Sequence, residues 1–122
     1  MDSVRTAEQQ IAAEVANRRR YSRYQIDVAL RVTVRSGDLV KAVHGRGSDV
    51  GQGGLAAHIA VELQEGDVVE LEITLPYSSE PLVVNATVRN RESYCYGMEF
   101  LNITDAQSSA LDRCCRSLAL TQ

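Results

Sequence analysis

Apolar and polar residues alternate along most of the chain between residues 26 and 101, which is the pattern of half-buried β-strands. The alternation is clearest over 26–35 and returns over 68–75, 84–88 and 94–101. Weaker strands are predicted over 39–48 and 55–61. Turn signals separate these segments at Ser36-Gly37-Asp38, at Glu65-Gly66-Asp67 and in a polar loop between Pro76 and Pro81.

A helix is predicted at each end of this strand region. Thr104 followed by Gln107 is a capping-box pattern, and the apolar residues after it recur at helical spacing up to Leu118. Over 3–18, Ser3 is a suitable N-cap and a thin apolar stripe follows. A stripe this thin predicts an N-terminal helix that packs on another surface or frays when alone.

Six short strands followed by a helix favour a mainly β protein, namely a small six-stranded antiparallel β-barrel with a C-terminal α-helix and an N-terminal helix. We expect residues 1–17 to form a helical extension and residues 18–122 to form the barrel domain. A chain of 122 residues is sufficient for one such core.

The composition argues against some classes of binding partner. The net charge of −3 argues against a DNA or RNA partner, and aromatic residues make up only 5% of the chain, which disfavours single-stranded nucleic acid stacked on the barrel. No apolar run reaches the length of a membrane span and no signal-peptide pattern opens the chain. We therefore expect a cytoplasmic protein without membrane insertion.

Reactive side chains do not form a recognisable catalytic or metal-binding pattern. The three cysteines fit neither a disulfide framework nor zinc spacing, and they are expected to be buried free thiols. His44 and His58 have no nucleophile or carboxylate at a catalytic spacing, so we expect them on the surface. The sequence predicts a protein that is not an enzyme and holds no metal or cofactor.

A cluster of arginines precedes the first strand. Arg19, Arg20 and Arg23 make this segment basic although the remainder of the chain is acidic. A guanidinium group binds phosphate through two parallel hydrogen bonds, and it also binds guanine O6 and N7. Taken alone, such a run is more often a solvated surface feature.

A second motif lies between two later strands and contains Asp49, Gly51, Gly53 and Gly54. The carboxylate can accept hydrogen bonds from guanine N1–H and N2–H₂. We expect the glycines to allow close approach of the backbone and to reach positive φ. Taken alone, such a glycine-rich segment is more often just a turn. Together, the two motifs predict a site for a ligand that carries phosphates and a base edge.

The chain resembles the PilZ family in these motifs. Arg19 and Arg23 match its Arg-x-x-x-Arg motif, and Asp49, Gly53 and Gly54 match parts of its Asp/Asn-x-Ser-x-x-Gly motif. The run from Gly97 to Leu101 is similar to the last strand of the family, and the resemblance covers roughly residues 18–120. It implies a barrel that binds the bacterial second messenger cyclic di-GMP, with the arginine segment ordered over the ligand and a signal passed to an effector protein that the sequence does not identify.

One position departs from the family pattern, because Gly51 stands where the family has serine. The loss of one hydrogen bond to a charged group costs about 1.5–3 kcal/mol. This leaves two alternatives open, a ligand-independent PilZ-like adaptor and a receptor for a related cyclic dinucleotide. The N-terminal helix is a candidate for a dimer contact, a lid or a partner site, so a homodimer also stays open.

Overall fold

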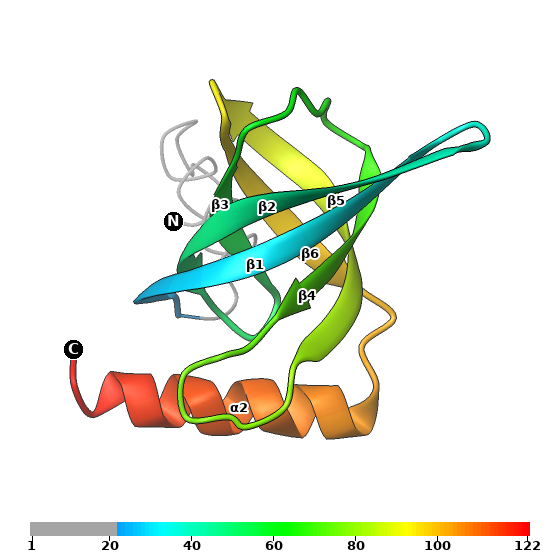
Figure 1. Cartoon of the computed structure of the whole chain (residues 1–122). Coiled ribbons are helices and arrows are strands. Elements are labelled where there is room, and N and C mark those ends of the chain that lie inside the picture. The colour runs from blue at the N-terminus through cyan, green and yellow to red at the C-terminus, as the bar shows by residue number, and fades with distance from the viewer. Residues whose placement is uncertain (1–21) are drawn as a thin grey trace, which may run out of the picture.

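The computed structural model describes residues 22–122, which form a closed antiparallel barrel followed by one helix (Figure 1). The strands are adjacent in the order β1-β2-β3-β6-β5-β4 around the barrel. Their bounds are β1 Tyr24–Ser36, β2 Leu39–Val50, β3 Gly54–Ile59, β4 Val68–Ile73, β5 Leu82–Glu92 and β6 Cys95–Leu101, and the helix is α2 Asp105–Ala119. The predicted six-stranded barrel with a C-terminal helix is thereby confirmed.

Some sequence predictions fall outside this part of the chain. The N-terminal helix predicted over 3–18 lies outside the described residues, as do Arg19 and Arg20. The boundary between an extension at 1–17 and a domain at 18–122 therefore stays a prediction.

Several strands begin or end at residues other than those predicted from the sequence. β2 continues to Val50, two residues past its predicted end, and β5 spans 11 residues from Leu82 to Glu92. The second half of β5 is polar, so its apolar pattern stops early. It stays a strand because it pairs with β6 as far as Glu92, which lies opposite Cys95. Non-local hydrogen bonds, which the local pattern does not report, extend the strand.

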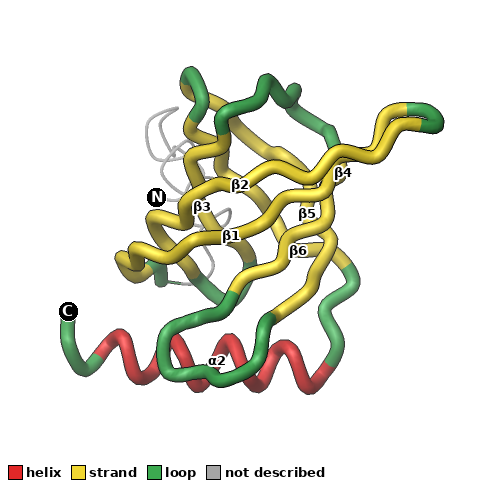
Figure 2. The backbone as a smooth tube through the Cα atoms, in the orientation of Figure 1, coloured by secondary structure: helices red, strands yellow, loops and turns green. Residues whose placement is uncertain are grey.

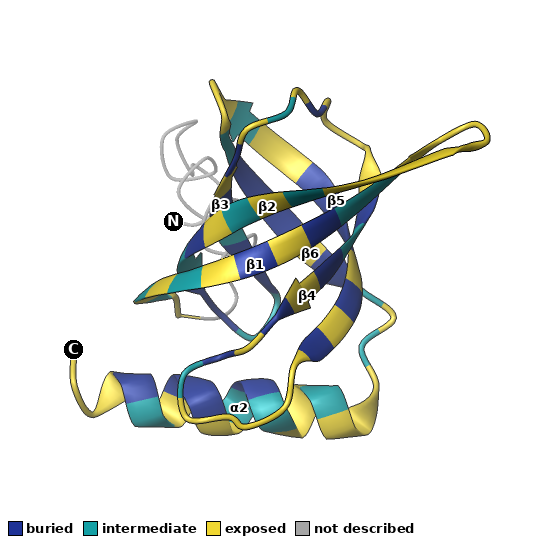
Figure 3. Ribbon diagram, in the orientation of Figure 1, coloured by how far each residue is buried: buried dark blue, intermediate teal, exposed yellow. Residues whose placement is uncertain are grey.

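The barrel interior is filled by alternate residues of all six strands, as the alternating burial along the ribbons shows (Figure 3). Tyr96 is the largest fully buried side chain. Its hydroxyl donates to the carbonyl of Val61 at 2.7 Å and accepts from the Leu63 amide at 2.9 Å, so the buried polar group is satisfied. The residues buried with it from the strands include Val32, Leu55, Ala57, Leu71, Ala86 and Met98.

Helix α2 lies across one end of the barrel, at the same end as the loop that joins β4 to β5 (Figure 2). The predicted capping box is confirmed, since Thr104 Oγ1 accepts from the Gln107 amide at 3.1 Å and the Gln107 side chain accepts from the Thr104 amide at 3.0 Å. No helix in residues 22–122 has the length and apolar character needed to cross a lipid bilayer.

The face of α2 toward the barrel carries two of the three thiols. Cys114 and Cys115 are buried, as expected, whereas Cys95 at the start of β6 is only partly buried. Burial raises the pKa of the Cys115 thiol to about 11, with smaller contributions from Cys114 and Asp112. Both thiols therefore stay protonated at neutral pH, which makes them packing groups rather than nucleophiles.

Candidate functional site

The structure brings the two predicted motifs into contact at Arg23 and Asp49. These residues are 26 positions apart, and the Arg23 guanidinium lies 3.5 Å from Asp49 Oδ1. Each side chain is about one-third exposed, at 34% and 31%, so a ligand at the surface can reach both. Arg23 and Asp49 thus form one polar pair on the outside of the barrel, and their role in ligand binding stays a prediction.

A β-bulge directs Asp49 outward. On β2, Gly47 pairs with Ala57 and Asp49 pairs with Ala56, which leaves Ser48 as an extra residue. Simple alternation from Gly47 would turn Asp49 toward the core, but the extra residue reverses the alternation, so that Asp49 faces out and Val50 is fully buried. The bulge therefore places the carboxylate on the outer side of the barrel wall.

The glycines of the second motif allow close approach, and the expectation of positive φ is wrong. Within residues 22–122 the glycines with positive φ are Gly37 and Gly66, both in turns. A Cβ at Gly51 would lie 2.8 Å from the Ser22 carbonyl oxygen, and a Cβ at Gly54 would lie 2.0 Å from the Met98 carbonyl oxygen. Both distances are shorter than real contacts of this kind, so the backbone of neighbouring segments fills the space that a side chain needs.

Gly53, the remaining glycine of the motif, lies in a loop that backbone hydrogen bonds hold in place. The Gly53 carbonyl accepts from the Phe100 amide at 2.9 Å, and the Gly51 amide donates to the Gly54 carbonyl at 2.9 Å. These hydrogen bonds hold the loop between β2 and β3 against β6. A direct role of the three glycines in ligand binding stays a prediction.

The approach of Ser22 to Gly51 leads to a prediction about the missing serine. If the chain binds cyclic di-GMP, as the family resemblance implies, Gly51→Ala is expected to weaken that binding by about fivefold, because the new methyl group displaces the segment that carries Arg23. Gly51→Ser adds the same carbon together with the hydroxyl of the family motif, and is expected to bind about tenfold more tightly than Gly51→Ala. Isothermal titration of both variants and the wild type measures these ratios.

Gly51→Ala is the matched control in this comparison, since it differs from Gly51→Ser by the hydroxyl alone. Equal affinities for the two variants would show that the hydroxyl has no partner on the ligand. An affinity of Gly51→Ala equal to that of the wild type would show that the Ser22 segment moves aside without cost.

The C-terminal part of the chain is hydrogen-bonded to both motif segments. Gln52, inside the second motif, donates from Nε2 to Asp112 Oδ1 of α2 at 2.7 Å. The Gln122 side chain accepts from the Gln25 amide at 2.8 Å and donates to the Gln25 carbonyl at 2.7 Å, two residues after Arg23. A movement at either motif is thereby linked directly to α2 or to the residues that follow it.

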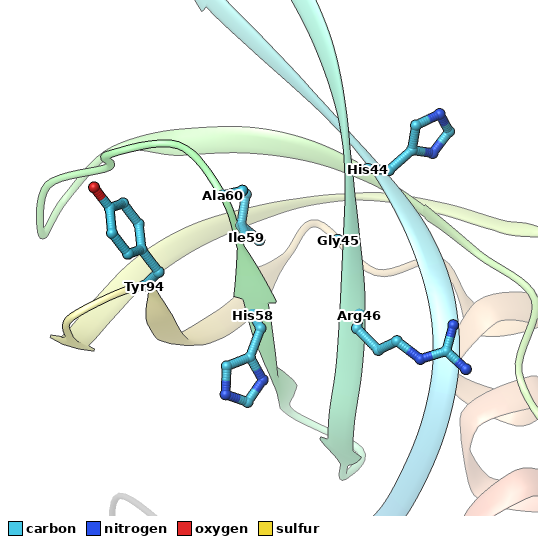
Figure 4. A pocket seen from close by; sticks show the side chains of 7 residues that line it. All are labelled: His44, Gly45, Arg46, His58, Ile59, Ala60 and Tyr94. Atoms are coloured by element: carbon cyan, nitrogen blue, oxygen red, sulfur yellow. The ribbon is translucent and has the colours of Figure 1, made fainter.

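An open hollow of about 590 Å³ lies on the barrel wall at the β2–β3 surface, and none of the predicted site residues among residues 22–122 lines it. Figure 4 shows Arg46 of β2 and His58 of β3 at the same level of the two paired strands, with their side chains pointing apart, and Tyr94 beside the β3 strand. Arg46 also donates to Asp27 Oδ1 at 2.5 Å. As expected, His44 and His58 are exposed. Sequence reasoning did not single out Arg46, for which the available signal was its outward place in the alternation of β2.

In residues 22–122, no group of three or more His, Cys, Asp or Glu side chains is arranged to hold a metal ion.

A comparison with protein-family models matches residues 17–117 to the PilZ domain. The chain belongs to the PilZ domain family. The match includes both motifs, the whole barrel and most of α2, so the resemblance drawn from Arg19, Arg23 and Asp49 is confirmed at the level of the family. A search of curated protein sequences finds no match to the chain.

Solved structures share the fold of this PilZ domain. The PilZ domain of YcgR from Escherichia coli with c-di-GMP has a TM-score of 0.66 and 20% sequence identity, over 85% of this chain and 93% of that one. YcgR from Escherichia coli in complex with c-di-GMP has a TM-score of 0.70 and 23% identity, over 85% of this chain and 47% of that one. The Bacillus subtilis inhibitor of motility, MotI/DgrA, has a TM-score of 0.67 and 21% identity, over 86% of this chain and 53% of that one.

These sequence identities are low, so the similarity to the three structures shows a shared fold and nothing more. The chain spans about half the length of the longer YcgR and MotI/DgrA structures.

Proposed function

We propose that this PilZ domain is a cytoplasmic receptor for cyclic di-GMP that binds the nucleotide without catalysis and passes the signal to a protein partner. The observation that carries the proposal is the pairing of Arg23 with Asp49 on the outer face of the barrel. The two motifs are useful as a ligand site only if they lie together, and the fold brings their side chains into contact. The YcgR structures with bound c-di-GMP support the choice of ligand.

The chemistry of the pair suits both parts of this ligand. Arg23 can take a phosphodiester through two charge-assisted hydrogen bonds, and Arg19 and Arg20 supply further guanidinium groups from the same segment. Asp49 accepts from the N1–H and N2–H₂ groups of a guanine. Because the Arg23–Asp49 pair is partly exposed, it contributes at most about 1 kcal/mol to stability. Exchanging this weak contact for contacts with the ligand therefore costs little.

Ligand binding is proposed to order the arginine segment over the nucleotide and to change the surface around α2. The hydrogen bonds of Gln25 with Gln122 and of Gln52 with Asp112 provide the connection, since each joins a motif segment to the C-terminal part. The altered surface is then available to an effector protein. Amide hydrogen exchange with and without ligand tests this step, and unchanged exchange in α2 and residues 17–25 would refute it.

Titration calorimetry with cyclic di-GMP, run in parallel with cyclic GMP–AMP, tests the proposed receptor function. We expect saturable binding of cyclic di-GMP in the micromolar range or tighter, because several charged hydrogen bonds and a base contact contribute. The stoichiometry distinguishes one bound nucleotide from a stacked pair. The proposed receptor function would be refuted if neither nucleotide gave a heat of binding with protein that circular dichroism shows to be folded.

A second candidate is a ligand-independent adaptor, and Gly51 is the observation that favours it. This position lacks the hydroxyl of the family motif, and the Ser22 carbonyl occupies the space above it. An adaptor needs neither Arg23 nor Asp49. Substitution of either residue by alanine would therefore leave the binding of its protein partner unchanged. Preferential binding of cyclic GMP–AMP would instead favour the receptor for a related dinucleotide.

A further inference from the structure

The outer face of β1 and β4 carries opposite charges on adjacent strands. Arg31 of β1 lies opposite Glu72 of β4, and Thr33 of β1 lies opposite Glu70 of β4. Arg31 and Glu72 are exposed, and Glu70 is partly exposed. Within residues 22–122, none of these three charged side chains takes part in an ion pair. The cation of β1 and the anions of β4 are therefore open to a partner.

The strands on either side continue this face. His44 of β2 lies opposite Arg31, and Val83 of β5 lies opposite Glu72, so one row of side chains crosses four strands. The next row contains Ala42, Thr33, Glu70 and Asn85. Each row spans three strand spacings, which is about 14 Å. Figure 1 shows β1, β2 and β4 on the near side of the barrel and α2 across its end, so no helix of residues 22–122 covers this face.

This face lies away from the proposed nucleotide site. The strands β1 and β4 are adjacent on one side of the closed barrel, and β3 and β6 are adjacent on the opposite side. Arg23 precedes the start of β1, whereas Arg31 lies in its middle, and roughly 26 Å of extended chain separates them. A partner can therefore bind this face while Arg23 and Asp49 stay accessible.

We propose that this face joins two copies of the chain into a dimer with two-fold symmetry. A two-fold axis that runs along the boundary between β1 and β4 places β1 of each copy over β4 of the other. Arg31 then meets Glu72 of the partner subunit, and the same ion pair forms a second time with the roles exchanged. In the next row, the Thr33 hydroxyl donates to Glu70 of the partner subunit.

The arrangement of charge selects a second copy of this chain rather than a different protein. A cation and anions lie side by side on this face, so a partner that carries charge of one sign would meet repulsion on one of the two strands. A second copy related by the two-fold axis instead offers an anion to each cation. It also covers apolar surface, because His44 lies over Val83 of the partner subunit, a side chain that is 44% exposed in the single chain.

Sedimentation equilibrium of the full chain tests the dimer. The contact is small and its ion pairs lie near solvent, so we expect a Kd on the order of 50 µM at low salt. Raising sodium chloride from about 0.05 to about 0.5 M should weaken the dimer several-fold, because salt screens the ion pairs. No nucleotide is added, so the result does not depend on the proposed receptor function.

Charge reversal tests the surface itself. Arg31→Glu and Glu72→Arg are each expected to raise the Kd of the dimer at least about tenfold, because each places like charges against one another across the axis. An equimolar mixture of the two variants is expected to dimerise with about wild-type affinity, since one copy then presents cations on both strands and the other presents anions. This rescue isolates the contact between copies, because neither variant regains an opposite charge within its own chain.

Glu92→Arg is the matched control. Glu92 is an exposed glutamate at the end of β5, outside both rows, and its reversal changes the net charge as Glu72→Arg does. This control should dimerise as the wild type does. Circular dichroism verifies that each variant is folded. If a reversal variant is unfolded, Arg31→Gln and Glu72→Gln repeat the test with an expected loss of about threefold each.

A wild-type chain that stays monomeric up to about 500 µM at low salt would overturn the proposal. So would a dimer whose Kd is unchanged in folded Arg31→Glu and Glu72→Arg, or is raised equally by Glu92→Arg. Failure of the mixture to regain the dimer would show that these two side chains do not meet across the axis, which also overturns the proposal. Binding of cyclic di-GMP is measured separately, so none of these outcomes removes the receptor function.

Discussion

Arg23→Ala is expected to lower the affinity for cyclic di-GMP by about 100-fold while the barrel stays folded. A guanidinium that binds a phosphate through two charged hydrogen bonds contributes about 3 kcal/mol, which is a factor of roughly 100 in Kd. The side chain is one-third exposed and its pairing with Asp49 is long, at 3.5 Å, so its removal costs the fold little. Titration calorimetry gives the affinity, and thermal unfolding followed by circular dichroism gives the stability.

Arg35→Ala is the matched control for this experiment. Arg35 is an exposed arginine near the far end of β1, where the β1–β2 hairpin projects from the barrel (Figure 1). The control removes the same charge, so a general electrostatic effect would weaken both variants equally. Arg23→Lys keeps the charge but loses the planar fork and should bind about tenfold more weakly than the wild type. Normal binding by Arg23→Ala would contradict the role assigned to Arg23.

Gly54→Ala is expected to destabilise the protein by about 3 kcal/mol, because its Cβ would overlap the backbone of β6. The added carbon would lie 2.0 Å from the Met98 carbonyl oxygen and 3.2 Å from the Glu99 Cα. Neither atom can rotate away, so the β3–β6 pairing must widen. The expected fall in the midpoint of thermal unfolding is roughly 10 °C.

Gly47→Ala provides the control for adding a methyl group near the same loop. Its Cβ would meet only side-chain atoms, the nearest being Ile26 Cδ1 at 3.2 Å, which can shift by a few tenths of an ångström. We expect its stability to change by less than about 1 kcal/mol. A Gly54→Ala protein of normal stability that no longer binds cyclic di-GMP would show that this glycine serves the ligand rather than the fold.

Local sequence signals predicted the elements that depend on local geometry. The alternation over 26–35 predicted β1, and Thr104 with Gln107 predicted the start of α2, because strand alternation and capping boxes are formed by residues close in sequence. The sequence also singled out Arg23 and Asp49, since their residue types and order resemble the family pattern, and their role in ligand binding stays a prediction. The second-motif glycines were expected to allow close approach of the backbone and to reach positive φ. Close approach occurs at Gly51 and Gly54, whereas positive φ does not, because the tertiary contacts with Ser22 and Met98 set the backbone there.

The local sequence pattern could not show which side chains point outward at a bulge or which residues are neighbours across strands. Asn90 carries no motif, and alternation from Val88 would have assigned it to the core. Arg46 and His58 are adjacent only because the register pairs them across β2 and β3. The hydrogen bond between Gln122 and Gln25 spans 97 positions and leaves no trace in the local pattern.

The sequence by itself determined the barrel class, the C-terminal helix, the family and the two motifs, because period, turn chemistry and residue spacing are properties of neighbouring residues. Only the tertiary structure decided which side chains share the outer face of the barrel. A single extra residue at Ser48 and another at Arg89 reverse the direction of the side chains that follow them. Bulge positions depend on hydrogen bonds between strands, so the outward direction of Asp49 and Asn90 is decided only once the barrel has closed.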